Sequence, residues 1–385
     1  MKIIHCHNRR ILSYFLLIVN AIIFLSLQIA PEKSKTVKVQ FISCDTIKLE
    51  GKLWFPIGRI SNKIVIAVAP CLTYSFKPVT DPKRLRYDLM LRDKLLKKGI
   101  IYFEFASRTD SILKYDWRYP ISTMFTKAQD LEAAIAYIRS RPDVKDKKII
   151  LIGQSEGGAT SAIVAARNNK ITAVVLLSAP GVPGQVFTDY QETCQDTMFM
   201  ANYGHLSEAF NSLNLISSLK EKNYEQSLDG YKNFRKETFG PLKDIVDNYD
   251  NYDTIATHLT NYLEQKWKKE NSETRKRFKN FSFYCYGNHY WAYIQPEQIA
   301  LRKWKPELYF PYIKCPVAAV VGTRDKAIEY RSSIINIKKL LASGGNNNFT
   351  PFILKDHDHF LENRRNNPSI QDSAVVKVVD WINRQ

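Results

Sequence analysis

Ser155 stands in the middle of a Gly-Gln-Ser-Glu-Gly segment that runs from Gly153 to Gly157. The mostly apolar residues 148–152 before it predict a buried strand, and the small residues after it predict a helix over 156–168. A Gly-x-Ser-x-Gly segment between a strand and a helix is typical of a sharp turn that lifts a nucleophilic serine above a sheet. The glycines leave room where side chains would collide with the turning backbone. We therefore expect a nucleophilic serine here, rather than an ordinary glycine-rich connection.

A serine nucleophile needs a base, and the base needs a carboxylate to orient it. In chains with this kind of turn the acid and then the base follow the serine. Asp325 directly follows an apolar run, and His359 lies after the last expected strand, so they are the expected acid and base. His357 is the alternative base, but His359 is followed by an aromatic residue, as is usual for the base in this position. Asp356 and Asp358 are the alternative acids, although they lie too close to the base in sequence to reach its far nitrogen easily.

The reaction of such a serine builds negative charge on a carbonyl oxygen, which two backbone amides must stabilise as an oxyanion hole. Glu156 is expected to supply one amide, because it follows the serine at the start of a helix. The second amide is expected from the loop after the apolar strand at 63–69, which begins with Pro70. Since proline has no amide hydrogen, the donor there is Cys71 or Leu72. This chemistry needs no metal and no cofactor.

The rest of the chain predicts the elements that would position these residues. Strands are expected at 37–43, 47–56, 63–69, 100–107, 148–152, 172–178, 315–325 and 350–354, and helices at 86–99, 126–141, 156–168, 329–342 and 371–383. This alternation predicts the α/β class, with a doubly wound, mostly parallel sheet covered by helices on both faces. Residues 185–310 break the alternation, since they are helical and rich in Tyr, Phe, Asn and Lys. We expect them to form a helical cap inserted between two parts of the sheet domain, 31–184 and 311–385.

Residues 1–30 have the pattern of a targeting segment. Lys2, Arg9 and Arg10 precede residues 11–30, which carry no charge and are mostly apolar. A basic start followed by such a run is typical of a signal peptide or of a single membrane anchor. We therefore expect an exported protein, periplasmic or extracellular, which is either cleaved after this segment or attached to the membrane through it.

The charge and the cysteines exclude other classes of function. Lys and Arg number 56 against 38 Asp and Glu, a net charge of +18. No nucleic-acid motif accompanies the densest basic run, 265–279, so we expect a solvated basic surface and no nucleic-acid partner. The six cysteines are widely spaced and form no CxxC or CxxH pattern, so neither a disulfide framework nor a metal site is expected.

Residues 130–184 contain a helix, the serine turn, the next strand and a Pro-Gly loop in that order, and they resemble the α/β-hydrolase superfamily. The resemblance is to the branch of esterases related to dienelactone hydrolase and prolyl oligopeptidase. Residues 49–56 resemble its opening strand, and 312–328 resemble the segment that carries the acid. The resemblance implies the α/β-hydrolase fold and a catalytic triad on Ser155, Asp325 and His359. Two segments depart from the family: Ala69-Pro70 stands where many members have His-Gly, and 106–111 keeps only Arg108 of an Asp-x-Arg-Gly segment.

We therefore expect a serine hydrolase that cleaves carboxylic esters of small molecules through an acyl-enzyme on Ser155. The same triad serves peptides, thioesters and acyl transfer, so a peptidase, a thioesterase and an acyltransferase are the alternatives within this chemistry. A second class is a non-catalytic binding protein that kept the fold, which the loss of a triad member would indicate; all three are present. A third class is a membrane-tethered scaffold, which only the N-terminal segment supports.

Overall fold

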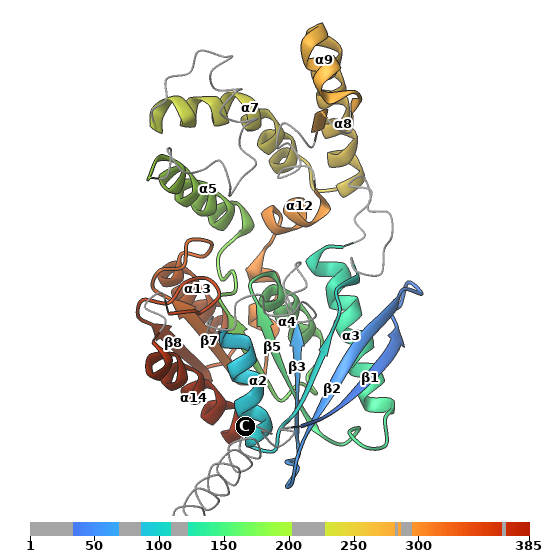
Figure 1. Cartoon of the computed structure of the whole chain (residues 1–385), viewed down its shortest axis with the longest axis vertical. Helices are drawn as coiled ribbons and strands as arrows, with labels where there is room; N and C mark the ends of the chain where they lie inside the picture. Colours follow the sequence, from blue (N-terminus) through green and yellow to red (C-terminus); the bar gives the residue numbers. More distant parts are fainter. Residues whose placement is uncertain are drawn as a thin grey trace, which may run out of the picture.

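The computed structural model describes residues 34–68, 86–108, 122–201, 228–281, 284–285, 295–363 and 367–385. Its centre is an 8-stranded sheet with the strand order β1-β2-β4-β3-β5-β6-β7-β8 (Figure 1). The strands are β1 (Ser34–Ile42), β2 (Lys48–Pro56), β3 (Lys63–Val68), β4 (Ile101–Phe105), β5 (Lys148–Gln154), β6 (Ala173–Leu177), β7 (Val317–Gly322) and β8 (Phe349–Leu354). β1 and β2 are antiparallel to their neighbours, and all the other pairs are parallel. The predicted doubly wound, mostly parallel sheet is confirmed.

Helices cover both faces of the sheet. They are α2 (Tyr87–Lys97), α3 (Met124–Ser140), α4 (Glu156–Arg167), α13 (Tyr330–Ser343) and α14 (Pro368–Arg384). Helices α3, α4 and α13 pack on one face, and α2 and α14 pack on the other (Figure 1). In β5, Ile149 belongs to the first core and Ile150 to the second, and both are fully buried. This burial explains why the central strands are apolar throughout instead of alternating with polar residues.

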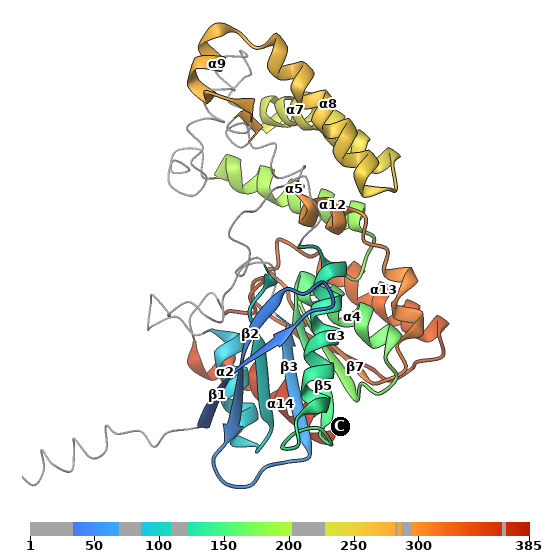
Figure 2. The same ribbon diagram turned by 90° about the vertical axis from the view of Figure 1, so that its right-hand side faces the viewer.

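The described residues between β6 and β7 are mostly helical. They contain α5 (Gly184–Ala201), α7 (Leu228–Asn248), α8 (Tyr252–Lys269), α9 (Ser272–Phe278) and α12 (Pro296–Arg302), followed by the short 3-10 helices η2 (Pro306–Leu308) and η3 (Phe310–Tyr312). Figures 1 and 2 place α5, α7, α8, α9 and α12 beyond the edge of the sheet at which the parallel strands end. Helices α7, α8, α9 and α12 share a hydrophobic core of their own.

Arg302 ties the inserted helices together. Its guanidinium donates to Asp247 on α7 at 2.7 and 2.5 Å and to Asp189 on α5 at 3.0 Å. Nearby, the Trp304 indole donates to the carbonyl of Pro180 at 3.0 Å, and Pro180 follows β6. The end of α12 is therefore bound to two other inserted helices, and the chain just after it is bound to the sheet domain.

None of the helices in the described parts of the chain is both long and apolar enough to cross a membrane. The apolar segment 11–30 lies outside the described residues.

Candidate active site

Ser155 occupies the turn between β5 and α4. Its φ is 52° and its ψ is −122°, a backbone conformation that is strained for a residue with a side chain and costs on the order of 1–3 kcal/mol. The Ser155 amide donates to the carbonyl of Leu177 on β6 at 2.8 Å, and the Ser155 carbonyl accepts from the amide of Gly158 at 2.9 Å. Hydrogen bonds on both sides therefore hold the strained residue in place.

The glycines around Ser155 are required by close backbone approaches. A Cβ on Gly153 would lie 2.1 Å from the carbonyl oxygen of Gly157, a contact that no side chain permits. A Cβ on Gly158 would lie 2.3 Å from the Cβ of Ala179, which follows β6. The first glycine allows the chain to turn, and the second lets the helix start lie against the neighbouring strand end. The role of Gly153 in the turn was predicted from the sequence.

His359 and Asp325 lie side by side. The Nδ1 atom of His359 is 3.0 Å from each carboxylate oxygen of Asp325, whose side chain is fully buried. One of these oxygens also accepts hydrogen bonds from the amides of Ala327 and Ile328, both at 2.8 Å. Tyr190 on α5 donates to the backbone carbonyl of Asp325 at 2.9 Å, so an inserted helix supports the acid loop. These hydrogen bonds hold the Asp325 loop and its carboxylate in the position in which the carboxylate contacts the imidazole.

The alternative acids and the alternative base have other partners. Asp356 accepts from Arg324 at 3.0 Å, and Asp358 accepts from the amides of Phe360 and Glu362 at 2.9 and 3.0 Å. The His357 ring is buried, and its Nδ1 donates to the carbonyl of Lys355 at 2.8 Å. Of the two histidines, the one in contact with Asp325 is therefore His359.

The nucleophile candidate and the acid–base pair lie at the same edge of the sheet. Ser155, Asp325 and His359 follow β5, β7 and β8, which run in the same direction, so their carboxyl ends share that edge. Within the described residues no hydrogen bond joins the Ser155 hydroxyl to His359. Such bonds are often long in a site without substrate and shorten when substrate binds.

The structure describes one of the two expected oxyanion donors and not the other. Glu156 is the first residue of α4, where backbone N–H groups point out of the helix end, toward the region in which negative charge would develop. Cys71 and Leu72 lie outside the described residues.

Comparisons with known proteins agree with this geometry. The family model "BAAT / Acyl-CoA thioester hydrolase C terminal" matches residues 130–238, which include the serine turn. An esterase from Pyrococcus furiosus superposes with a TM-score of 0.53 at 15% identity, over 91% of each chain. The same esterase in another crystal form gives a TM-score of 0.50 at 14% identity, over 91% of this chain and 90% of the esterase. The chain therefore has the α/β-hydrolase fold, as the resemblance in the sequence predicted.

A dienelactone hydrolase from Anabaena variabilis aligns less closely, with a TM-score of 0.47 at 12% identity over 92% of this chain and 99% of that one. No curated protein matches the chain in sequence.

A buried ion cluster next to the serine was not predicted from the sequence. Lys127 on α3 lies 2.8 Å from a carboxylate oxygen of Glu156 and 3.8 Å from one of Glu297 on α12. Burial raises the pKa of Glu297, as does the Glu156 carboxylate, and the Lys127 ammonium opposes the rise. The cluster connects the residue after Ser155 to an inserted helix.

Arg108, noted in the sequence only as a match to part of an Asp-x-Arg-Gly segment, is buried and binds two carboxylates. Its guanidinium donates to both carboxylate oxygens of Asp130 on α3, at 2.8 and 2.6 Å, and to Asp45 at 2.6 Å. Burial works against the charge, but these two acids outweigh it and raise the pKa of Arg108. Arg108 therefore fastens α3 to the end of β4 and to the turn between β1 and β2.

Across the described parts of the chain, no group of three or more His, Cys, Asp or Glu side chains is arranged to hold a metal ion. Within these described parts, four cysteines are free thiols: Cys44, Cys194, Cys285 and Cys315.

Proposed function

We propose that the protein is a serine hydrolase that cleaves carboxylic esters of small molecules through an acyl-enzyme on Ser155. The observation that carries the proposal is the position of a strained serine at the sheet edge where His359 contacts Asp325. A serine with φ of 52° is costly to hold, and such strain concentrates at functional sites. The esterase fold and the family-model match support hydrolysis as the class of reaction.

In the proposed reaction, Ser155 Oγ attacks the acyl carbonyl carbon while Nε2 of His359 takes the hydroxyl proton. Asp325 holds the imidazole so that Nδ1 carries its proton, and it stabilises the imidazolium that forms. The oxyanion accepts hydrogen bonds from the Glu156 amide and from the amide of Cys71 or Leu72. His359 then gives its proton to the departing alcohol. His359 next deprotonates a water molecule, which attacks the acyl carbon. As the acyl-oxygen bond to Ser155 breaks, His359 returns the proton to Ser155 Oγ, which releases the acid and the free serine.

Labelling with a fluorophosphonate probe tests the nucleophile. The intact protein should be labelled and Ser155→Ala should not. Ser178→Ala is the matched control, because Ser178 also ends a strand with a positive φ, of 45°, and is fully buried. It should keep its label. Equal labelling of the intact protein and Ser155→Ala, or no labelling of either, would contradict the proposal.

Thioester hydrolysis is the second candidate, because the description of the matched family model names acyl-CoA thioester hydrolysis. The triad would act in the same way, with a thiol leaving in place of an alcohol. Rates for matched acyl chains as aryl esters and as CoA thioesters separate the two. A kcat/KM that favours the aryl esters at every chain length supports the esterase, and the opposite order supports the thioesterase.

A further inference from the structure

The described chain enters the fold at the edge of the sheet opposite the serine. Ser34, the first residue of β1, pairs with Pro56, the last residue of β2. The loop 57–62 follows directly and leads into β3. The apolar segment 11–30 is separated from Ser34 by only the three residues 31–33. Three residues span at most about 11 Å, so a membrane that holds 11–30 must lie close to this edge.

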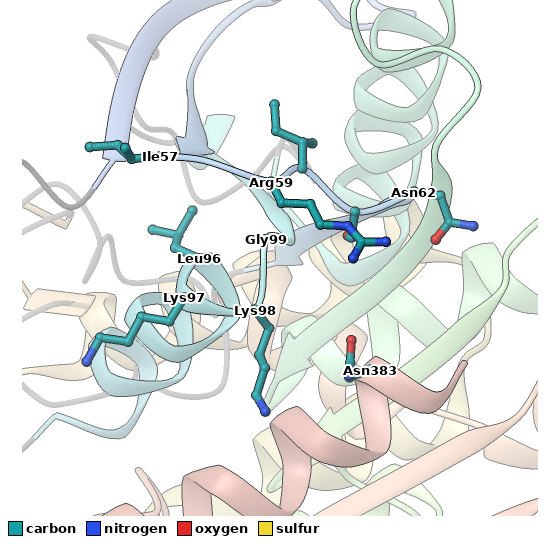
Figure 3. Close-up of a pocket in the computed structure, with 10 residues that line it drawn as sticks. Ile57, Arg59, Asn62, Leu96, Lys97, Lys98, Gly99 and Asn383 are labelled. Carbon is teal, nitrogen blue, oxygen red and sulfur yellow. The ribbon is translucent and has the colours of Figure 1, made fainter.

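This edge carries both exposed apolar and exposed basic side chains. Ile57 is 64% exposed and Ile60 44%, and Arg59 stands between them in the loop. Lys97 and Lys98 are exposed at the end of α2 on the other side of a shallow hollow, which Figure 3 shows. We call these five residues the basic edge.

Several lysines in this region are already engaged. Beside the basic edge, Lys63 donates to the carbonyl of Asn383 at 2.8 Å, and Lys148 donates to that of Gln385 at 3.0 Å, which neutralises the end of α14. Within the basic edge, Lys98 lies 3.5 Å from Asp380 on the same helix. Arg59 in the loop and Lys97 at the end of α2 are both exposed and form no ion pair within the described residues, so they are the residues that best offer charge to an outside surface (Figure 3).

We propose that the basic edge docks on an anionic lipid surface while residues 11–30 remain in the bilayer. The proposal rests on the predicted anchor and is independent of the hydrolase chemistry. The isoleucines would enter the headgroup region, and the cations would pair with lipid phosphates, as in other proteins that combine an apolar anchor with a basic patch. The sheet edge that carries Ser155 would then face away from the membrane, with its opening toward solvent.

Photocrosslinking of the full chain in lipid vesicles tests this orientation. Ile60 is replaced by benzoylphenylalanine, and the chain is reconstituted in phosphatidylcholine with or without phosphatidylglycerol. Ile42 carries the same replacement as a matched control, because it is 67% exposed at the opposite end of β1. The 9 residues of β1 place the two ends of that strand about 26 Å apart. We expect lipid adducts from the Ile60 position and few from the Ile42 position.

Charge reversal tests the electrostatic part. The double variant Arg59→Glu with Lys97→Glu should lower the yield of lipid adducts at the Ile60 position in anionic vesicles by about fivefold or more. Each cation near an anionic membrane surface raises the affinity for that surface by about this factor. Lys276→Glu with Lys279→Glu, exposed on or next to α9, removes the same charge from the inserted helices and should change little.

Three results would overturn the proposal. Failure of the chain to float with the vesicles would rule out the anchor. Equal adducts from the Ile60 and Ile42 positions would rule out the orientation. Crosslinking of the Ile60 position to a second chain instead of lipid would assign the basic edge to a dimer. Each of these outcomes leaves fluorophosphonate labelling of Ser155 unaffected, so failure here is distinguishable from failure of the proposed reaction.

Discussion

Lys127 and Glu156 form a buried ion pair between α3 and α4, with 2.8 Å from Nζ to Oε2 and side chains that are 7% and 2% exposed. Glu156 directly follows Ser155, so this pair fixes the helix start whose amide is the proposed oxyanion donor. Glu297 on α12 lies 3.8 Å from the same ammonium, so Lys127 also links α12 to α3. A change in the inserted helices therefore acts on the same charge that holds the residue next to Ser155.

Removing the lysine should leave two buried carboxylates without their shared cation. We expect Lys127→Met to lower the free energy of unfolding by about 3 kcal/mol, because an uncompensated buried charge is costly. Urea unfolding followed by circular dichroism measures this loss. Lys170→Met, at an exposed position on the turn after α4, should cost less than about 0.5 kcal/mol. Equal and small effects of both substitutions would show that the pair contributes little.

Gly153 offers a second test of the turn. We expect Gly153→Ala to destabilise the fold by about 3 kcal/mol and to lower kcat, because its Cβ would meet the Gly157 carbonyl at 2.1 Å. Gly240→Ala makes the same chemical change inside α7, where a Cβ has nothing within 4 Å. It should alter the unfolding free energy by less than about 1 kcal/mol. Thermal melts and ester hydrolysis measure both variants; normal turnover in Gly153→Ala would argue against a rigid turn.

The sequence predicted the sheet and the serine turn because their signals are local. Apolar runs of strand length mark strands that are buried on both faces, and the glycines beside Ser155 reflect contacts within a few residues. Asp325 and His359 were found because each follows a strand, in a chain order that parallel topology brings to one edge. Their contact at 3.0 Å is what that topology produces. Whether they act as acid and base stays a prediction until activity is measured.

The buried charges were missed because their partners are distant in sequence. Glu297 is separated from Lys127 by the serine turn and by most of the inserted helices. One signal was present: Lys127 stands four residues before Leu131, so a lysine lies on the buried face of the helix. Such a charge must be paired inside the protein, but the sequence does not say with which acid. Arg108 and Asp130 illustrate the same limit, as they meet from different elements 22 residues apart.

The two histidines near the end of the chain should respond differently to substitution. His359→Ala should lower kcat/KM by about 1,000-fold or more while the protein stays folded, because the base and the contact with Asp325 are lost. His357→Ala should mainly reduce stability, since that ring is 2% exposed and bonds to the Lys355 carbonyl. Hydrolysis rates per folded molecule, with His258→Ala as an exposed control, separate the effects. Loss of turnover in His357→Ala alone would reverse the assignment.

Glu297 should make stability depend on pH in the acidic range. Its folded pKa is raised, above all by burial, from an ordinary value of 4.5. As the pH rises past 4.5, the unfolded chain releases this proton before the folded chain does. The folded state then binds more protons, so the contribution of Glu297 to stability falls as the pH rises. Glu297→Gln has no proton to lose and escapes this fall.

The expected result is that the unfolding free energy of Glu297→Gln, relative to the unsubstituted protein, increases from about pH 4 to about pH 7. Urea titrations at several pH values measure this difference. Glu307→Gln removes an exposed carboxylate after α12 and should give a difference that is flat with pH. If the Glu297→Gln difference is also flat, the folded and unfolded pKa values of Glu297 are equal. If it decreases with pH, Lys127 holds the ionised carboxylate more strongly than burial opposes it, and the cluster is a net stabilising ion network.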